Sequence, residues 1–111
     1  MASDKTVGIA GLGLIGRAVA ERLTGAGFDV LGYDVAPAAM KAFPGKATAD
    51  ALKAPRIVLA VFDTPDVEDV VSLSSARLYV DCTTGDPIKI DALAAALAAR
   101  GVGYEIGRAH V

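Results

Sequence analysis

Three glycines, at positions 11, 13 and 16, form the pattern in this sequence that is best suited to bind a ligand. The spacing Gly-x-Gly-x-x-Gly is typical of loops that hold the diphosphate of a dinucleotide. Gly11 would let the chain turn sharply, Gly13 would let the main chain approach the phosphates, and Gly16 would let the next helix pack closely. The N–H groups at the start of that helix would face the negative charge. The predicted cofactor-binding residues here are Gly11, Leu12, Gly13, Leu14, Ile15 and Gly16.

An acidic residue, Asp34, follows the glycines at about the 20-residue separation where a carboxylate binds the adenosine ribose. Its charge would repel the 2′-phosphate of NADP, by about 1 kcal/mol at 4 Å in water and about 4 kcal/mol at an effective dielectric constant of 20. Residues 35–39 contain no Arg or Lys to offset this repulsion. The sequence therefore favours NAD over NADP. Two plainer interpretations stay open: a glycine turn that binds nothing, and an Asp34 that only caps the helix after Pro37.

The elements that must position these residues follow from the spacing of apolar side chains. Residues 6–10 predict a short buried strand immediately before the glycines. Residues 14–23 place apolar and charged side chains on opposite faces of a helix, which the glycines at 25 and 27 would end. Residues 28–33 predict a second strand, and this strand delivers Asp34 to its end.

The rest of the chain continues the alternation of strands and helices. Further strands are predicted at 46–48, 56–62, 78–80 and from 102 onwards, and helices at 37–43, 49–54, 65–73 and 87–100. Asp86 and Pro87 are suited to the N-cap and first position of the last helix, whose apolar face is expected to contain Ile88, Leu93, Ala96 and Leu97. This order predicts an α/β fold with a parallel, doubly wound sheet of the Rossmann type.

Ligands of such sheets bind outside the carboxyl ends of the strands, so the loops at 62–65 and 81–86 join the candidate site. Thr83 and Thr84 carry hydroxyls there that could bond a ribose, a nicotinamide amide or a substrate carboxylate. They could equally bond the backbone of their own loop.

The other polar side chains suggest no chemistry of their own. Cys82 is expected to be a small buried apolar residue, and Asp63 and Asp81 are expected to finish turns. The acids at 66, 68 and 69 look like the solvated start of a helix rather than a metal site. No catalytic residue and no metal ligand is therefore predicted within the chain.

Composition limits the class of protein. The chain has 111 residues, of which 53% are apolar, and a net charge of −2 with no basic run, so it should form one domain that does not bind nucleic acid. The longest apolar run, 57–62, is too short to cross a bilayer, and the start of the chain lacks a signal-peptide stretch. The single cysteine is typical of a reducing compartment. We therefore expect a cytoplasmic protein with no membrane partner.

Two motifs resemble the β-hydroxyacid dehydrogenases, the family that includes 3-hydroxyisobutyrate dehydrogenase and glyoxylate or succinic semialdehyde reductases. Residues 7–20, Val-Gly-Ile-Ala-Gly-Leu-Gly-Leu-Ile-Gly-Arg-Ala-Val-Ala, are similar to the family's opening, and residues 80–87 to its Asp-x-Ser/Thr-Thr motif. The resemblance covers residues 6–104. It implies that Thr84 contacts the nicotinamide and that Phe62 and Asp63 line the cofactor. Thr83, whose hydroxyl stands at the same strand end, is a candidate substrate-binding residue.

The resemblance also implies an activity for the parent protein. That activity is hydride transfer between NAD(P) and a small β-hydroxyacid or its semialdehyde or oxo partner, by a homo-oligomer. Many members have Asn-Arg where this chain has Asp34-Val35, so the cofactor could differ from theirs, and the stretch from 73 to 78 is shorter than usual. In the family a Ser-Gly-Gly substrate loop and an all-helical domain with the catalytic lysine come next. We therefore expect this chain to bind dinucleotide with negligible turnover.

The end of the chain departs from the family. Residues 106–111, Ile-Gly-Arg-Ala-His-Val, are what a common sequencing adapter encodes in one frame, just before a stop codon. The hypothesis is a native domain over 1–104 and a non-native tail over 105–111, which removes His110 as a candidate base. Resequencing the locus tests it. Two rivals stay open: a non-catalytic dinucleotide-binding or redox-sensing module that ends naturally at Val111, and a fragment of a phosphogluconate-type dehydrogenase that uses NADP.

Overall fold

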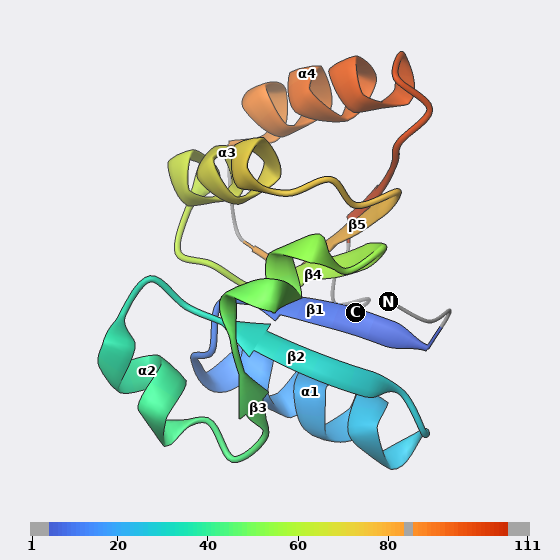
Figure 1. Cartoon of the computed structure of the whole chain (residues 1–111). Coiled ribbons are helices and arrows are strands. Elements are labelled where there is room, and N and C mark those ends of the chain that lie inside the picture. The colour runs from blue at the N-terminus through green and yellow to red at the C-terminus, as the bar shows by residue number, and fades with distance from the viewer. Residues whose placement is uncertain (1–4, 84–85, 107–111) are drawn as a thin grey trace, which may run out of the picture.

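Six parallel strands form one sheet in the computed structural model, which describes residues 5–83 and 86–106 (Figure 1). The strands are β1 (Thr6–Ala10), β2 (Asp29–Tyr33), β3 (Lys46–Ala47), β4 (Arg56–Leu59), β5 (Leu78–Asp81) and β6 (Gly103–Ile106). Their order across the sheet is β3-β2-β1-β4-β5-β6, and all five neighbouring pairs are parallel. This is the strand order of the doubly wound dinucleotide-binding fold, so the predicted Rossmann-type architecture is confirmed.

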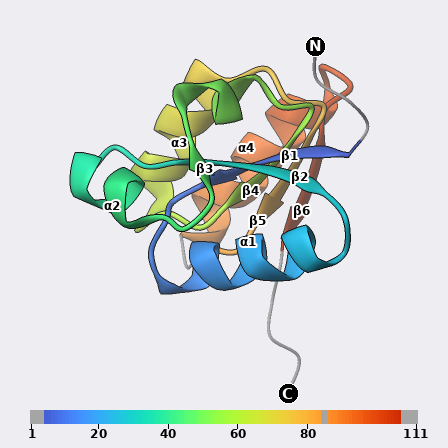
Figure 2. The same cartoon turned by 60° about the horizontal axis from the view of Figure 1, so that its bottom comes forward.

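Helices cover both faces of this sheet, as the apolar runs of the central strands require. In Figure 1 and Figure 2, α1 (Leu14–Gly25) and α2 (Pro37–Ala42) lie on one side, and α3 (Thr64–Leu73) and α4 (Pro87–Ala98) on the other. The short 3₁₀ helix η1 (Ala49–Lys53) contributes Leu52 to the apolar cluster that also contains residues of α3 and α4. No helix in the described residues is long and apolar enough to cross a membrane.

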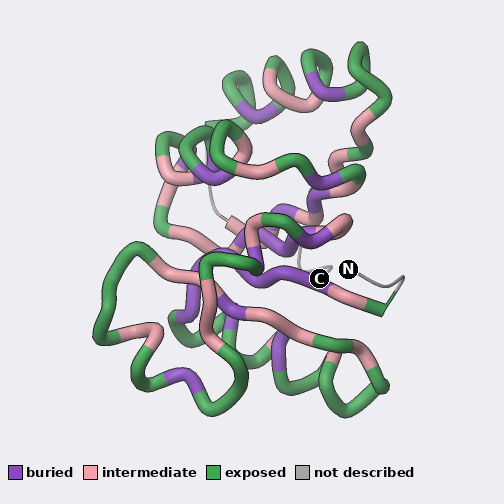
Figure 3. Tube along the Cα trace, in the orientation of Figure 1, coloured by how far each residue is buried: buried purple, intermediate pink, exposed green. Residues whose placement is uncertain are grey.

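The core consists of two apolar layers, one on each face, because successive strand residues point to opposite sides. Ile9 and Val58 join the layer under α1, whereas Ile57, Leu59 and Tyr79 join the layer under α3 and α4. Figure 3 shows the same division, with buried residues concentrated along the central strands and exposed ones on the outer turns of the helices.

Most helix boundaries follow the local signals in the sequence. Asp63 and Asp86 cap α3 and α4 with their carboxylates, and Pro87 occupies the first turn of α4 as predicted. Gly27 follows α1 with a φ of +93°, a conformation that glycine adopts without strain. Thr48 caps η1, which forms within the predicted 49–54 segment.

Two sequence-based predictions of local structure were wrong in part. The strand predicted over 56–62 ends at Leu59, because the N–H of Val61 donates to the Thr83 hydroxyl instead of to a neighbouring strand. The predicted apolar face of α4 was half right: Leu97 is buried and Leu93 packs against the core. Ile88, however, is 81% exposed and Ala96 is exposed, whereas Ile90 is buried. Helical spacing defines possible faces, but the packing of α4 on the sheet selects among them.

The last strand continues past the predicted domain boundary at residue 104. Glu105 and Ile106 pair with Val80 and Asp81 of β5. Backbone hydrogen bonds at a sheet edge can form with almost any side chains, so the pairing of these two residues is compatible with both a native and a non-native tail.

Candidate functional site

The glycine loop lies between β1 and α1 at the carboxyl edge of the sheet, where its conformation depends on the absence of side chains. Gly11 has a φ of +101°, and a Cβ there would lie 2.2 Å from the carbonyl oxygen of Ala60. A Cβ on Gly16 would lie 1.8 Å from the carbonyl oxygen of Gly11. These are the turn and close-packing roles expected for the two glycines.

The middle glycine faces open space instead. A Cβ on Gly13 would have no atom within 4 Å, although Gly13 is the N-cap of α1. No side chain caps α1, in contrast to the carboxylate caps of α3 and α4. The start of α1 therefore combines free volume above the main chain with N–H groups that lack intrahelical partners.

Asp34, at the end of β2, is connected to this loop. One carboxylate oxygen accepts from the N–H of Leu12 and the other from the N–H of Ala36, each at 2.9 Å. The N-cap of α2 is Ala36, so Asp34 fixes the turn before α2 and does not cap the helix itself. Each carboxylate oxygen can accept a second hydrogen bond, which leaves the half-buried group able to bind further hydroxyls.

A cavity of about 520 Å³ opens beside the glycine loop and Asp34, a volume typical of small-molecule sites. Its lining comes from the glycine loop, the end of β2, the β4–α3 loop and α3. The residues are Ala10, Gly11, Gly13, Leu14, Ile15, Tyr33, Asp34, Val35, Ala60, Val61, Phe62, Asp66, Asp69, Val70 and Leu73. Apolar side chains dominate its rim, where Leu14, Val35 and Phe62 are all strongly exposed.

The structure thus brings together six of the residues that sequence analysis singled out: Gly11, Gly13, Leu14, Ile15, Asp34 and Phe62. Leu12 and Gly16 are buried beneath the loop, and Asp63 does not line the cavity but accepts a hydrogen bond from Asp66 at the start of α3. Thr84 lies outside the described residues. For all of these residues, including the six that line the cavity, cofactor binding stays a prediction.

Sequence reasoning missed several lining residues. Tyr33 and Val61 adjoin predicted site residues, so their place in the chain was a usable signal. Asp66 and Asp69 were interpreted only as a solvated helix start, yet they lie on the face of α3 that lines the cavity. Only the position of α3 relative to β1 and β4 reveals this.

The hydroxyl of Thr83 connects two strand ends. Its oxygen accepts from the N–H of Val61 at 3.1 Å and its O–H donates to the carbonyl of Leu59 at 3.4 Å. The side chain therefore bonds loop backbone, one of the two interpretations left open, and substrate binding by Thr83 stays a prediction.

Burial and the charge of Asp81 raise the pKa values of two side chains in this region, Cys82 and Tyr104. Burial, and then the charge of Asp81, raise the pKa of the Cys82 thiol, so this side chain remains protonated and packs as an apolar group. Burial, a hydrogen bond to Asp81 and the charge of that carboxylate raise the pKa of Tyr104, which keeps its hydroxyl as a proton donor.

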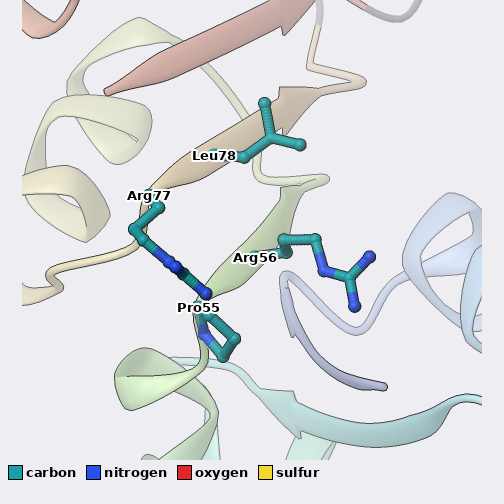
Figure 4. Close-up of a pocket in the computed structure, with 4 residues that line it drawn as sticks. All are labelled: Pro55, Arg56, Arg77 and Leu78. Carbon is teal, nitrogen blue, oxygen red and sulfur yellow. The ribbon is translucent and has the colours of Figure 1, made fainter. Parts of the chain in front are cut away.

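A second cavity, of about 390 Å³, lies at the opposite edge of the sheet, where β4 and β5 begin. Pro55, Arg56, Arg77 and Leu78 line it (Figure 4). Figure 4 shows the two arginine side chains diverging, and Arg56 lies over the ring of Phe28 at 5.6 Å. The guanidinium groups do not converge on one ligand, and no predicted site residue is nearby.

Comparison with known proteins identifies the family. Residues 1–104 match the NAD-binding domain of the D-isomer specific 2-hydroxyacid dehydrogenases. The chain belongs to this family. It is thus an NAD-binding domain of an oxidoreductase family, and this part of the sequence-based prediction is confirmed. No curated protein matches the sequence.

Solved structures share the fold of this NAD-binding domain. The Mycobacterium tuberculosis 3-hydroxyisobutyrate dehydrogenase superposes with a TM-score of 0.71 at 22% identity, covering 96% of this chain and 39% of that one. The Salmonella typhimurium 3-hydroxyisobutyrate dehydrogenase gives 0.71 at 24% identity, with 91% and 40% covered. An imine reductase from Myxococcus stipitatus in complex with NADP+ gives 0.76 at 19% identity, with 89% and 39% covered. The NAD-binding domain spans about two fifths of these proteins.

Proposed function

We propose that this domain binds NAD(H) along the carboxyl edge of its sheet. The observation that carries the proposal is the Asp34 carboxylate bonded to the glycine loop beside a helix with no side-chain cap. In this arrangement the diphosphate lies over Gly13 and the start of α1, and the adenosine ribose lies on Asp34. The nicotinamide half then extends towards Phe62 and, as the family resemblance implies, Thr84. The apolar rim offers flat surfaces to the two bases.

Charge in the cavity supports NAD rather than NADP. The charged side chains among the described lining residues are all aspartates, at positions 34, 66 and 69. A 2′-phosphate on the ribose would lie next to Asp34, at a cost of about 1–4 kcal/mol for charges 4 Å apart. The NADP+ complex of the imine reductase shows that this fold accommodates NADP elsewhere, so the preference rests on this chain's own residues.

We further propose that the parent enzyme transfers a hydride between the nicotinamide and a small β-hydroxyacid or its semialdehyde or oxo partner. Support comes from the glycine motif, the Asp-x-Thr-Thr motif at residues 81–84 and the fold shared with two 3-hydroxyisobutyrate dehydrogenases. A 2-hydroxyacid is the second candidate, favoured by the family match over residues 1–104. The nicotinamide supplies the hydride chemistry, and this domain binds and orients the cofactor.

The domain itself should bind cofactor without turnover, because the resemblance places the substrate loop and the catalytic lysine beyond residue 104. Titration of ¹⁵N-labelled protein with NADH and NADPH tests the binding. We expect amide shifts at positions 11–16 and 34, with NADH the tighter ligand. Unmoved amides at millimolar NADH would overturn the proposal. Tighter binding of NADPH would favour a phosphogluconate-type parent, and steady oxidation of NADH with glyoxylate would contradict the lack of turnover.

A further inference from the structure

A buried carboxylate, Asp81, connects the outer strand β6 to the loops of the candidate site. Asp81 is only 2% exposed, and a carboxylate at such a position requires hydrogen-bond donors. The hydroxyl of Tyr104, on β6, donates to its Oδ2. The N–H of Thr83 donates to its Oδ1 at 2.7 Å. Among the hydrogen bonds of the described residues, Tyr104 provides the one donor to Oδ2.

The chain of contacts continues from Asp81 to the cavity wall. The backbone of Thr83 is held by Asp81, and its hydroxyl accepts the N–H of Val61 at 3.1 Å. Val61 lines the cavity next to Phe62. Three successive hydrogen bonds thus join the Tyr104 hydroxyl, on β6, to the backbone of the β4–α3 loop, past the carboxyl ends of β5 and β4.

The hydrogen-bond network lies beside one half of the proposed cofactor. A dinucleotide straddles the point where the strand order reverses, here between β1 and β4. Asp34, at the end of β2, marks the adenosine half. The backbone at Val61 and Thr83, which follow β4 and β5, therefore lies towards the nicotinamide half, and the network holds it in place.

We infer that Tyr104 is a positioning residue for the nicotinamide half of the cofactor site, acting through Asp81 and Thr83. This inference rests on the proposed NAD(H) binding. The Tyr104 hydroxyl does not contact the cofactor. It donates to the buried Asp81 carboxylate, which also accepts from the N–H of Thr83. Without the Tyr104 hydroxyl, Asp81 would have to rotate to another donor, and the hydrogen bond between Val61 and Thr83 would weaken.

Tyr79 provides a matched control. Its ring centroid lies 6.3 Å from that of Tyr104, and its hydroxyl bonds the Ser74 hydroxyl at 2.7 Å, beyond the end of α3. That bond leads away from the cavity. Tyr79→Phe therefore removes a hydrogen-bonded tyrosine hydroxyl, as Tyr104→Phe does, without removing a hydrogen bond of the network.

The test compares NADH with ADP-ribose, which lacks the nicotinamide, as ligands of the whole chain. In Tyr104→Phe the Kd for NADH should rise about fivefold relative to the Kd for ADP-ribose, the equivalent of one weakened hydrogen bond. Tyr79→Phe should preserve the wild-type ratio. An unchanged ratio in Tyr104→Phe, or equal weakening of both ligands, would overturn the inference. If the wild-type chain bound neither ligand, the proposed function itself would fail.

A measurement on the free protein tests the network directly. Hydrogen exchange at the Val61 amide should accelerate about fivefold in Tyr104→Phe and in Thr83→Val, because each variant removes one hydrogen bond of the network that links Tyr104 to Val61. It should stay at the wild-type rate in Tyr79→Phe and in Thr83→Ser, which keeps the hydroxyl. Should Tyr104→Phe fail to fold, the Thr83→Val and Thr83→Ser pair decides. Unchanged exchange in Thr83→Val would refute the network.

Discussion

The two glycines that flank the start of α1 should respond in opposite ways to the same added methyl group. In Gly16→Ala the Cβ would lie 1.8 Å from the Gly11 carbonyl oxygen, so α1 must retreat by about 1.5 Å to reach an ordinary contact. Overpacking of this kind costs about 1–3 kcal/mol. With a urea m-value of about 2 kcal/mol/M, the midpoint of unfolding should fall by about 0.5–1.5 M.

Gly13→Ala is the matched variant. The added Cβ has no atom within 4 Å and the φ of −77° suits alanine, so the urea midpoint should stay within about 0.5 M of wild type. The methyl group would occupy the space proposed for the diphosphate. The Kd for NADH should therefore rise at least about tenfold, as for a lost close contact of about 1.4 kcal/mol.

The assays are urea unfolding followed by circular dichroism and NADH titration followed by fluorescence, on the same samples. Wild-type affinity in a folded Gly13→Ala protein would refute the placement of the diphosphate over this residue. A Gly16→Ala protein as stable as wild type would refute the packing argument. The two failures are independent because one variant reports on binding and the other on folding.

Other changes give separable outcomes. Asp34→Asn removes the charge that repels a 2′-phosphate, so the ratio of the NADPH Kd to the NADH Kd should fall at least about fivefold by calorimetry; an unchanged ratio would remove Asp34 as the determinant. Because the pKa of Tyr104 is raised in the folded state, its contribution to stability is complete below about pH 10 and is lost as the pH rises further. The urea midpoint should consequently drop between pH 9 and 11, and drop less in Tyr104→Phe; equal drops would contradict this assignment. Asp86→Ala removes the cap that accepts from Ile88 and Lys89, and should cost about 1 kcal/mol in urea unfolding with no change in NADH affinity.

Local signals in the sequence were sufficient for most of the architecture. The apolar runs, the glycines and the Asp86-Pro87 pair specify strands, turns and a helix start within a few residues of each position, and such signals do not depend on the rest of the fold. The glycine motif and Asp34 could be recognised for the same reason, because their chemistry is tied to fixed spacing.

Interactions between distant residues were not predictable. The end of β4 is determined by the Thr83 hydroxyl, 22 residues after Val61, and the apolar run at 56–62 contains no sign of it. The burial of Asp81 depends on Tyr104, 23 residues further along the chain. Likewise Ile88 is as apolar as Ile90, and only the docking of α4 decides which of the two is buried.

The central position of β1 has a consequence for synthesis. β1 pairs with β2 on one side and β4 on the other, and the glycine loop that follows it is held by the carbonyl of Tyr33 and packs on the backbone of Ala60. A nascent chain that ends before Arg56 lacks one of these neighbours. The segment made first at the ribosome therefore acquires its nucleotide-binding shape only after more than half of the domain has emerged, which is the cost of building a site from non-local parallel pairs.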